Sequence, residues 1–173
     1  KDVNALVRSG NDAGYSFEVI KSVLKVNDKQ KVRLYEKVKN HYNDLKGKRF
    51  ALWGLAFKPD TDDIREAPAL YMIEELLKAG AEITAFDPEA MPNIKAILGD
   101  RISFSTDEYL ALEGADALLI CTEWGIFRNP DFNRIKSLLN DAVIFDGRNL
   151  FEIGEMNDKG FYYCSIGRNV IEK

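Results

Sequence analysis

Residues Lys48–Leu70 read KRFALWGLAFKPDTDDIREAPAL, and they contain a strand, a loop and the start of a helix. Arg49–Trp53 is a mostly apolar run of strand length, and Gly54 ends it. A long loop rich in charged residues follows, and Pro68 fits the first turn of a helix, where a missing N–H costs nothing. In an open α/β sheet, loops at the carboxyl ends of strands bind ligands. We therefore expect this loop to meet an anionic ligand.

Strands and helices alternate beyond this loop. We expect further strands at 82–86, 101–104, 115–121, 142–145 and 161–166. We expect helices at 68–79, 92–98, 106–113 and 132–139, the third of them capped by Thr106. This alternation predicts an α/β fold, a Rossmann-like doubly wound parallel sheet with right-handed crossovers. A long α-helix precedes the sheet.

That helix is predicted from a stretch without Gly or Pro between Ser16 and Gly47. A helix of about 29 residues is about 43 Å long, which exceeds the width of a small domain. Part of its apolar face therefore packs against another domain or a second subunit, unless the helix folds back on its own domain. Residues 1–14 are expected to be irregular or to form a short helix.

Size and composition exclude several classes of protein. The chain has 173 residues, 46% of them hydrophobic and 30% charged, with a net charge of −4. One globular domain with an appendage fits this length. The mixed, mildly acidic charge argues against a nucleic-acid partner, and no apolar run is long enough for a membrane span. The start at Lys1-Asp2 has neither a Met nor a signal peptide, so we expect a piece of a longer protein.

Cysteine and histidine are too few for several kinds of site. With Cys121, Cys164 and the single His41, we expect no disulfide framework, no metal site and no Ser-His-Asp triad. A reducing cytoplasm is the expected location. Cys121 ends a predicted buried strand without a nearby histidine, so we interpret it, like Cys164, as a packing residue.

Three cations are the best candidates for an anion site. Lys58, Arg65 and Arg148 all follow predicted strand ends, which lie on one rim of a parallel sheet. Arginine can bind phosphate through a bidentate fork, and lysine acts as a point charge. We interpret this rim as part of a nucleotide-sugar site. The alternative is ordinary ion pairing with nearby aspartates, namely Asp60, Asp63 and Asp146.

The turn Gly54-Leu-Ala56 is a poor dinucleotide fingerprint, because it lacks the second glycine that lets the backbone approach a pyrophosphate. Asp87, after the second strand, is placed either to bind a ribose or to cap a turn before Pro88. Complete NAD binding by this domain alone is therefore not the favoured interpretation.

Two other patterns have plainer explanations. The acidic run after Pro59 does not match a calcium loop, because Arg65 occupies the position that needs a glycine. Trp124 and Phe127 could stack on a base, but closure of the core is the expected role for aromatic side chains beside a buried strand.

Four motifs carry a resemblance to a known family. They are GLAFKPDTDDIREAPA at 54–69, AFDPEAMPN at 85–93, ADALLICTEW at 115–124 and IFDGRNLF at 144–151. In order and spacing this chain resembles the C-terminal part of the UDP-glucose/GDP-mannose dehydrogenase family, over essentially its whole length. Ala67 departs from the pattern, since the family often has serine there.

The resemblance implies different roles for different parts of the protein. Residues 1–45 resemble the central helical segment, which makes inter-domain and dimer contacts, and residues 46–173 resemble the UDP-sugar-binding domain. NAD binds to a separate N-terminal domain, which we expect upstream of this chain together with a catalytic cysteine. The whole protein is then a homodimer that oxidises UDP-glucose to UDP-glucuronate with two NAD, and this piece is inactive alone.

The resemblance also assigns roles to individual residues. Asp2 is the catalytic position, helping to place the water or base, and Lys1 and Arg65 approach the NAD phosphates. Phe57, Lys58 and Arg148 contact the UDP-sugar. Two alternatives stay open: the same family acting on GDP-mannose or a UDP-N-acetylhexosamine, and a nucleotide-binding or dimerisation module without enzymatic activity.

Overall fold

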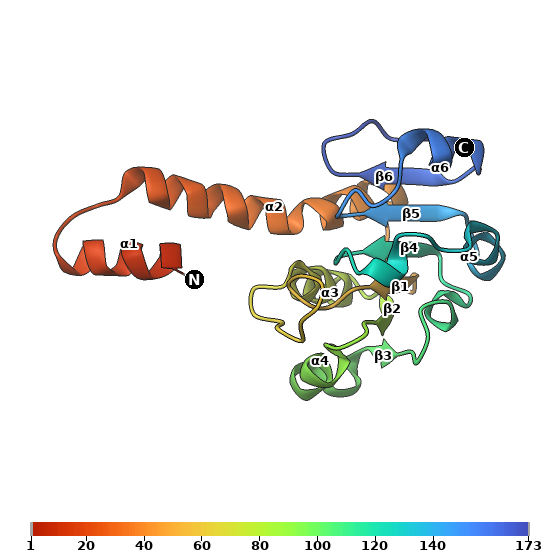
Figure 1. The fold of residues 1–173 in the computed structure, drawn as a ribbon, viewed down its shortest axis with the longest axis horizontal. Helices are drawn as coiled ribbons and strands as arrows, with labels where there is room; N and C mark the ends of the chain where they lie inside the picture. The colour runs from red at the N-terminus through yellow and green to blue at the C-terminus, as the bar shows by residue number, and fades with distance from the viewer. Residues whose placement is uncertain (1, 173) are drawn as a thin grey trace. The chain divides into compact units, whose positions relative to one another are not determined.

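The chain divides into two compact units, residues 1–33 and 34–173. The structure is a computed structural model that describes residues 2–172, apart from the side chains at positions 2 and 4. Figure 1 labels its helices and strands. The first unit holds α1 (Asp2–Asp12) and most of α2 (Glu18–Tyr42). Residues 2–12 are thus helical, one of the two outcomes left open by the sequence.

The boundary between the units falls inside α2, because the last turns of this helix belong to the second unit. Leu34 and Val38 are buried there in the core of the sheet domain. In the first unit, valines at helical spacing remain exposed: 78% of Val19, 54% of Val23 and 58% of Val26. The assignment of 1–45 and 46–173 to separate roles stays a prediction.

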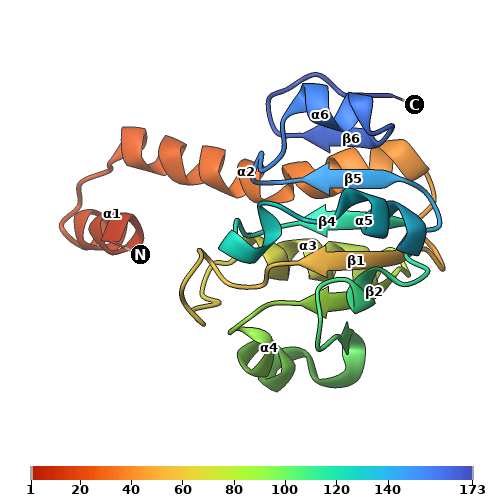
Figure 2. The same ribbon diagram turned by 45° about the vertical axis from the view of Figure 1, so that its right-hand side comes forward.

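The second unit is built on six parallel strands, as predicted. They are β1 (Arg49–Trp53), β2 (Glu82–Phe86), β3 (Ser103–Phe104), β4 (Ala117–Ile120), β5 (Val143–Asp146) and β6 (Tyr162–Ser165). Their order in the sheet is β3-β2-β1-β4-β5-β6, the doubly wound arrangement. Every strand pair is parallel, and the arrows of β1, β4 and β5 point the same way in Figure 2.

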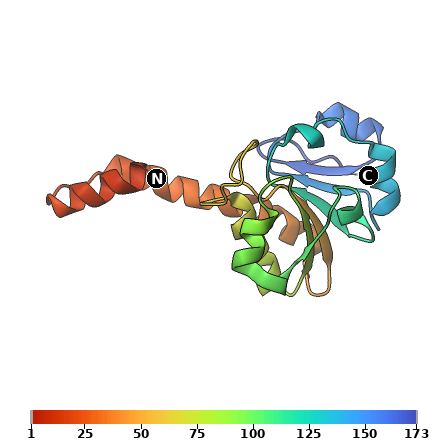
Figure 3. The same ribbon diagram turned by 60° about the horizontal axis from the view of Figure 1, so that its bottom comes forward.

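Helices connect the strands and cover both faces of the sheet. They are α3 (Pro68–Lys78), α4 (Met91–Leu98), α5 (Phe132–Leu138) and α6 (Ile153–Asp158). In Figure 3 the green helix α4 and the blue helix α6 lie on opposite sides of the strands. Short 3-10 turns occur at η1 (Gly99–Arg101), η2 (Leu110–Leu112) and η3 (Gly125–Phe127).

Two local expectations differ from the structure. The predicted helix over 106–113 is wrong, since only the short turn η2 forms there. The Asp107 carboxylate accepts the N–H groups of Tyr109 and Leu110 at 2.8 and 3.0 Å, and this local capping favours a turn. Conversely, α6 was not expected, because Gly154 in its first turn weakens the helical pattern.

The core lies between the sheet and its helices. All four residues of β4 and of β5 are buried, as expected for parallel strands covered on both faces. Phe127 is buried and stacks on Trp53, with ring centroids 4.8 Å apart, and Trp124 is also buried. The core role predicted for these two aromatic residues is confirmed. No helix in the described part of the chain is both long and apolar enough to cross a membrane.

Candidate functional site

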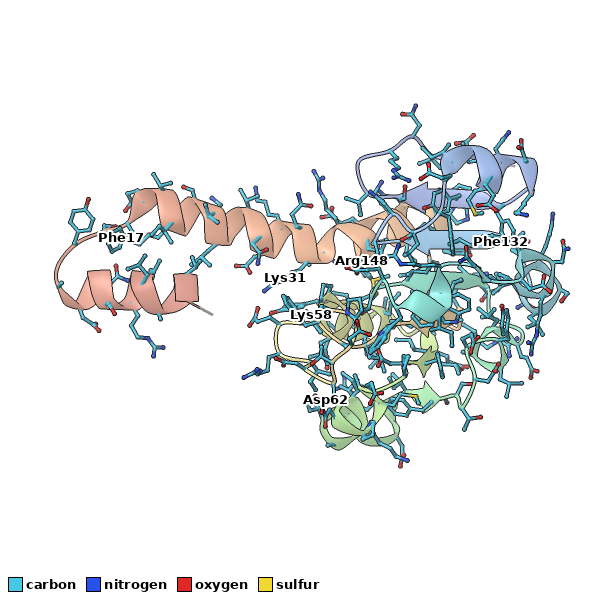
Figure 4. All side chains as sticks on the ribbon, in the orientation of Figure 1. Phe17, Lys31, Lys58, Asp62, Phe132 and Arg148 are labelled. Carbon is cyan, nitrogen blue, oxygen red and sulfur yellow. The ribbon has the colours of Figure 1, made fainter. Side chains whose placement is uncertain are left out.

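The carboxyl ends of the parallel strands share one edge, and the candidate anion ligands gather there. Lys58 follows β1, and Arg148 follows β5, with only β4 between these strands. Figure 4 shows both labelled side chains on the same side of the sheet. Both side chains therefore lie at the carboxyl-terminal end of the strands, as the parallel topology requires.

The loop after β1 is tied down at its base. Gly54 has φ +89°, and a Cβ there would lie 2.5 Å from Cβ of Thr122, so this position requires glycine. The Phe57 N–H donates to the carbonyl of Asp63 at 2.8 Å, closing the loop on itself. Half of the Phe57 surface remains exposed, at 50%, so an aromatic ring is accessible at the residue that precedes Lys58 in the chain.

The tip of this loop is fixed to α4. The Asn93 side-chain amide donates to the backbone carbonyl of Asp62 at 2.9 Å and to its carboxylate at 3.2 Å. An open depression of about 600 Å³ lies here, lined by residues 61–65, Asn93 and Ala96. The part of the loop around Asp62 is thus fixed against α4.

Arg65 and Lys58 differ in their partners. The Arg65 guanidinium binds the Asp63 carboxylate in a fork, with contacts of 2.8 and 2.5 Å. Hydrogen bonds and the charge of Asp63 raise the pKa of Arg65. Arg65 thus forms the ion pair with Asp63 that the alternative named, and its predicted role beside the NAD phosphates stays a prediction. Lys58 is exposed, and within the described part of the chain it forms no ion pair with Asp60 or any other carboxylate.

Arg148 lies in a turn that is anchored by a buried carboxylate. Asp146 is fully buried, and its Oδ1 accepts the Arg148 N–H at 2.8 Å. Its Oδ2 accepts the Leu150 N–H at 2.7 Å and the Tyr163 hydroxyl at 2.8 Å. Asp146 therefore accepts hydrogen bonds from the backbone of the turn and from Tyr163, and the alternative of an ion pair between Asp146 and the Arg148 side chain is wrong.

The guanidinium of Arg148 instead pairs with Glu123, which follows β4. Its Nε donates to Oε2 of Glu123, and its Nη2 donates to Oε1 at 2.6 Å. Partial burial raises the pKa of Glu123, but the hydrogen bonds and charge of Arg148, a backbone hydrogen bond and the charge of Arg128 together outweigh it and lower this pKa below its usual value. Sequence reasoning missed Glu123. The adjacency of β4 and β5 was the only signal for it.

The turn after β1 does not fit NAD. The N–H groups of Leu55 and Ala56, which would face a pyrophosphate in a dinucleotide site, donate to Asp87 at 2.6 and 3.1 Å. Asp87 is fully buried and also accepts the indole N–H of Trp124 at 3.0 Å. Of its two predicted roles, capping is confirmed and ribose binding is wrong, because the carboxylate is enclosed and saturated with protein donors.

Neither cysteine is a candidate nucleophile. Both are buried and free, and burial raises the pKa of Cys121 to about 12. The Lys37 ammonium lies 3.6 Å from the Cys164 sulfur. The packing role predicted for both cysteines is confirmed. Among the described residues, no group of three or more His, Cys, Asp or Glu side chains could hold a metal ion.

The remaining predicted residues are not placed by this structure. Lys1 lies outside the described residues, and so does the side chain of Asp2. Their predicted roles beside NAD and the catalytic water therefore stay predictions.

Strand order, parallel pairing and the anchored carboxyl-edge turns define a Rossmann-like nucleotide-binding class of domain. Residues 51–153 match the model of the UDP-glucose/GDP-mannose dehydrogenase family, UDP binding domain. The chain belongs to this family.

Known relatives agree with this assignment. A UDP-glucose 6-dehydrogenase of Bacillus subtilis is 43% identical over 171 residues, which cover 99% of this chain and 37% of the relative. A UDP-glucose 6-dehydrogenase of Pseudomonas aeruginosa is 41% identical, over 97% of this chain and 38% of the relative. The chain thus spans somewhat more than a third of the length of these relatives.

Solved structures show the same fold. A UDP-glucose dehydrogenase from Pyrobaculum islandicum matches with a TM-score of 0.78 and 30% identity, over 89% of this chain and 34% of that one. An NDP-N-acetyl-D-galactosaminuronic acid dehydrogenase from Methanosarcina mazei matches with a TM-score of 0.81 and 26% identity, over 98% of this chain and 37% of that one. The predicted fold class is confirmed.

Proposed function

We propose that this chain is the C-terminal part of a UDP-glucose 6-dehydrogenase, an NAD-dependent enzyme that oxidises UDP-glucose to UDP-glucuronate. Its own contribution is the binding of the UDP-sugar by residues 46–173. The observation that supports this proposal most strongly is that Lys58 and Arg148 both lie at the carboxyl ends of the strands, in a domain that matches the family's UDP-binding model.

The edge suits a sugar diphosphate. Arg148 offers a planar guanidinium, which can bind phosphate oxygens through parallel N–H groups. Lys58 adds a point charge, and among the residues that the structure describes no carboxylate forms an ion pair with it. The exposed ring of Phe57 provides an apolar wall beside Lys58. Together these three side chains bind the nucleotide part of the substrate and orient it.

The redox step belongs to a separate N-terminal domain, because the turn after β1 does not fit NAD. NAD held by that domain would supply the hydride acceptor for the oxidation of the sugar. Within this chain, Arg65 and Lys1 approach its phosphates, and Asp2 helps to place the catalytic water or base. These three roles rest on the family resemblance.

The long helix supplies the contacts to other parts of the enzyme. Residues 1–45 join the N-terminal domain and form a homodimer, and the exposed valines of α2 are the apolar surface that such contacts bury. A cytoplasmic location is supported by the two free cysteines.

The proposal is tested in the full-length enzyme with Arg148→Ala and Lys58→Ala. Loss of a charged phosphate contact raises the KM for UDP-glucose by about tenfold for each variant. Arg101→Ala is the matched control, since this exposed arginine pairs with Glu74 instead and its removal leaves KM unchanged. A normal KM in Arg148→Ala contradicts the proposed site. Purified chain 1–173 produces no NADH with UDP-glucose; measurable turnover refutes its assignment as the non-redox part.

A second candidate keeps the family and changes the sugar nucleotide. It is favoured by the fold match to the NDP-N-acetyl-D-galactosaminuronic acid dehydrogenase from Methanosarcina mazei. Calorimetry of the full-length enzyme with UDP-glucose, a UDP-N-acetylhexosamine and GDP-mannose separates these substrates. Preference for GDP-mannose eliminates the UDP-glucose assignment. A purely structural module is excluded once a glycine-rich NAD domain is found upstream in the coding sequence.

A further inference from the structure

The guanidinium of Arg148 is already oriented by the protein before any ligand binds. Its Nε and Nη2 face the two carboxylate oxygens of Glu123 in a side-on fork. An arginine has five N–H donors, so this fork leaves three of them for another partner. The Arg148 side chain is 34% exposed and that of Glu123 is 24% exposed, which keeps the free donors accessible.

The backbone of the same turn is fixed independently. Asp146 accepts the Arg148 N–H at 2.8 Å. Asn149, with φ +56°, donates to the carbonyl of Ile166 at 3.1 Å and accepts its N–H at 3.0 Å, which ties the turn to the end of β6. The main freedom left to Arg148 is therefore rotation about its side-chain bonds, and Glu123 removes it.

We propose that Glu123 is a positioning residue for the sugar nucleotide: it holds the Arg148 guanidinium so that the remaining donors face the diphosphate. This inference rests on the proposed function. Ordering a long side chain during binding weakens affinity by about 2- to 12-fold. Here the ordering is completed in the folded protein, so binding avoids that loss.

The carboxylate of Glu123 also repels an anion bound nearby, and the geometry decides whether this repulsion or the orientation of Arg148 dominates. Glu123 occupies the Nε and Nη2 side of the guanidinium, so a phosphate on the free donors binds an adjacent side of the group rather than the side that Glu123 takes. The positive charge of Arg148 is spread over a group that contacts both anions, and the site is partly exposed, so solvent and salt screen the repulsion. Orientation therefore outweighs repulsion.

The test uses the full-length enzyme with Glu123→Ala. The KM for UDP-glucose rises about 2- to 12-fold, and kcat stays unchanged because Glu123 acts only on binding. Glu123→Gln retains one acceptor and the side-chain shape, and it gives a smaller rise in KM. Glu74→Ala is the matched control, because it breaks an equivalent fork to Arg101, with contacts of 2.8 and 3.1 Å, outside the site. It leaves KM unchanged.

A double variant shows whether Glu123 works through Arg148. In the Arg148→Ala background, Glu123→Ala produces no further change in KM, since there is no guanidinium left to orient. A further rise in that background overturns the inference, as does a normal or lowered KM in Glu123→Ala alone. Thermal melts of each variant verify folding, and Glu123→Gln replaces Glu123→Ala if the latter unfolds.

The same measurements separate this inference from the proposed function. If Arg148→Ala leaves KM unchanged, the proposed UDP-sugar site is wrong, and the role of Glu123 is overturned with it. If Arg148→Ala raises KM while Glu123→Ala does not, the site stands and only the positioning role is overturned.

Discussion

Replacing Asp87 by asparagine tests a buried carboxylate that accepts five hydrogen bonds from three segments of the domain. Its Oδ2 accepts three donors, the backbone N–H groups of Leu55 and Ala56 and the indole N–H of Trp124. Its Oδ1 accepts the N–H groups of Glu89 and Ala90 at 2.9 and 2.7 Å. The carboxylate thus joins the turn after β1, the turn after β2 and the segment after β4.

Asparagine keeps one oxygen and replaces the other by an NH₂ group, which cannot accept. Whichever way the amide is turned, at least two of the N–H donors around position 87 face another donor. An unsatisfied buried donor costs about 1–3 kcal/mol, so Asp87→Asn lowers the free energy of unfolding by about 2–6 kcal/mol. This is a large part of the roughly 5–15 kcal/mol that stabilises a typical domain.

Urea unfolding of chain 1–173, followed by tryptophan fluorescence, measures this loss. Both tryptophans, Trp53 and Trp124, lie in the sheet domain, so the signal reports this unit alone. Asp107→Asn is the matched control, because Asp107 also caps two N–H groups but is 40% exposed, and its loss costs about 1 kcal/mol or less. Equal decreases in the free energy of unfolding of the two variants would show that the buried hydrogen bonds of Asp87 contribute no more than the exposed ones of Asp107.

Further predictions concern other parts of the chain. Gly54→Ala lowers the free energy of unfolding, measured by urea titration, by at least about 2 kcal/mol, because the added Cβ clashes with Thr122 and the backbone has a positive φ. The control Gly154→Ala, whose Cβ would meet nothing within 4 Å, leaves this free energy unchanged or raises it. Cys121, with its pKa raised to about 12, does not react with a disulfide reagent at pH 8 until urea is added, and rapid reaction of the native protein contradicts its burial. The pKa of this thiol rises on folding from 9.0 to about 12, so its contribution to stability is complete below pH 9 and is lost as the pH rises towards 12. The free energy of unfolding, measured as a function of pH, shows this loss. Val23→Glu on α2 dissociates the full-length enzyme into monomers in sedimentation experiments, whereas a retained dimer removes this face from the interface.

Local patterns predicted most of the sheet domain, because its strands are short buried runs with clear ends. The runs around Arg49–Trp53 and Ala117–Ile120 have a glycine or a polar segment at their ends, and both form strands. The parallel topology then placed Lys58 and Arg148 at one edge without any knowledge of their partners. Elements with a mixed local signal were harder to predict, as the missed helix α6 and the expected helix over 106–113 show.

Partners that come from distant segments could not be predicted in this way. The pairing of Glu123 with Arg148 joins residues 25 positions apart, across neighbouring strands. Asp87 had two equally good interpretations in sequence, and only the convergence of donors from three segments decides between them. Sequence periodicity reports burial and direction, whereas a hydrogen-bond partner depends on the packed arrangement of the whole sheet.

The most direct test of the central claim is a titration of ¹⁵N-labelled chain 1–173 with UDP, followed by amide chemical shifts. We expect millimolar or tighter binding, with the largest changes at the turns that follow β1 and β5, namely at Phe57 and Lys58 and at 147–149. The amides around Arg49 and Gly114, at the opposite end of the strands, stay unchanged. Changes centred at that opposite end, or no change at either turn with millimolar UDP, contradict the claim that these turns bind the sugar nucleotide.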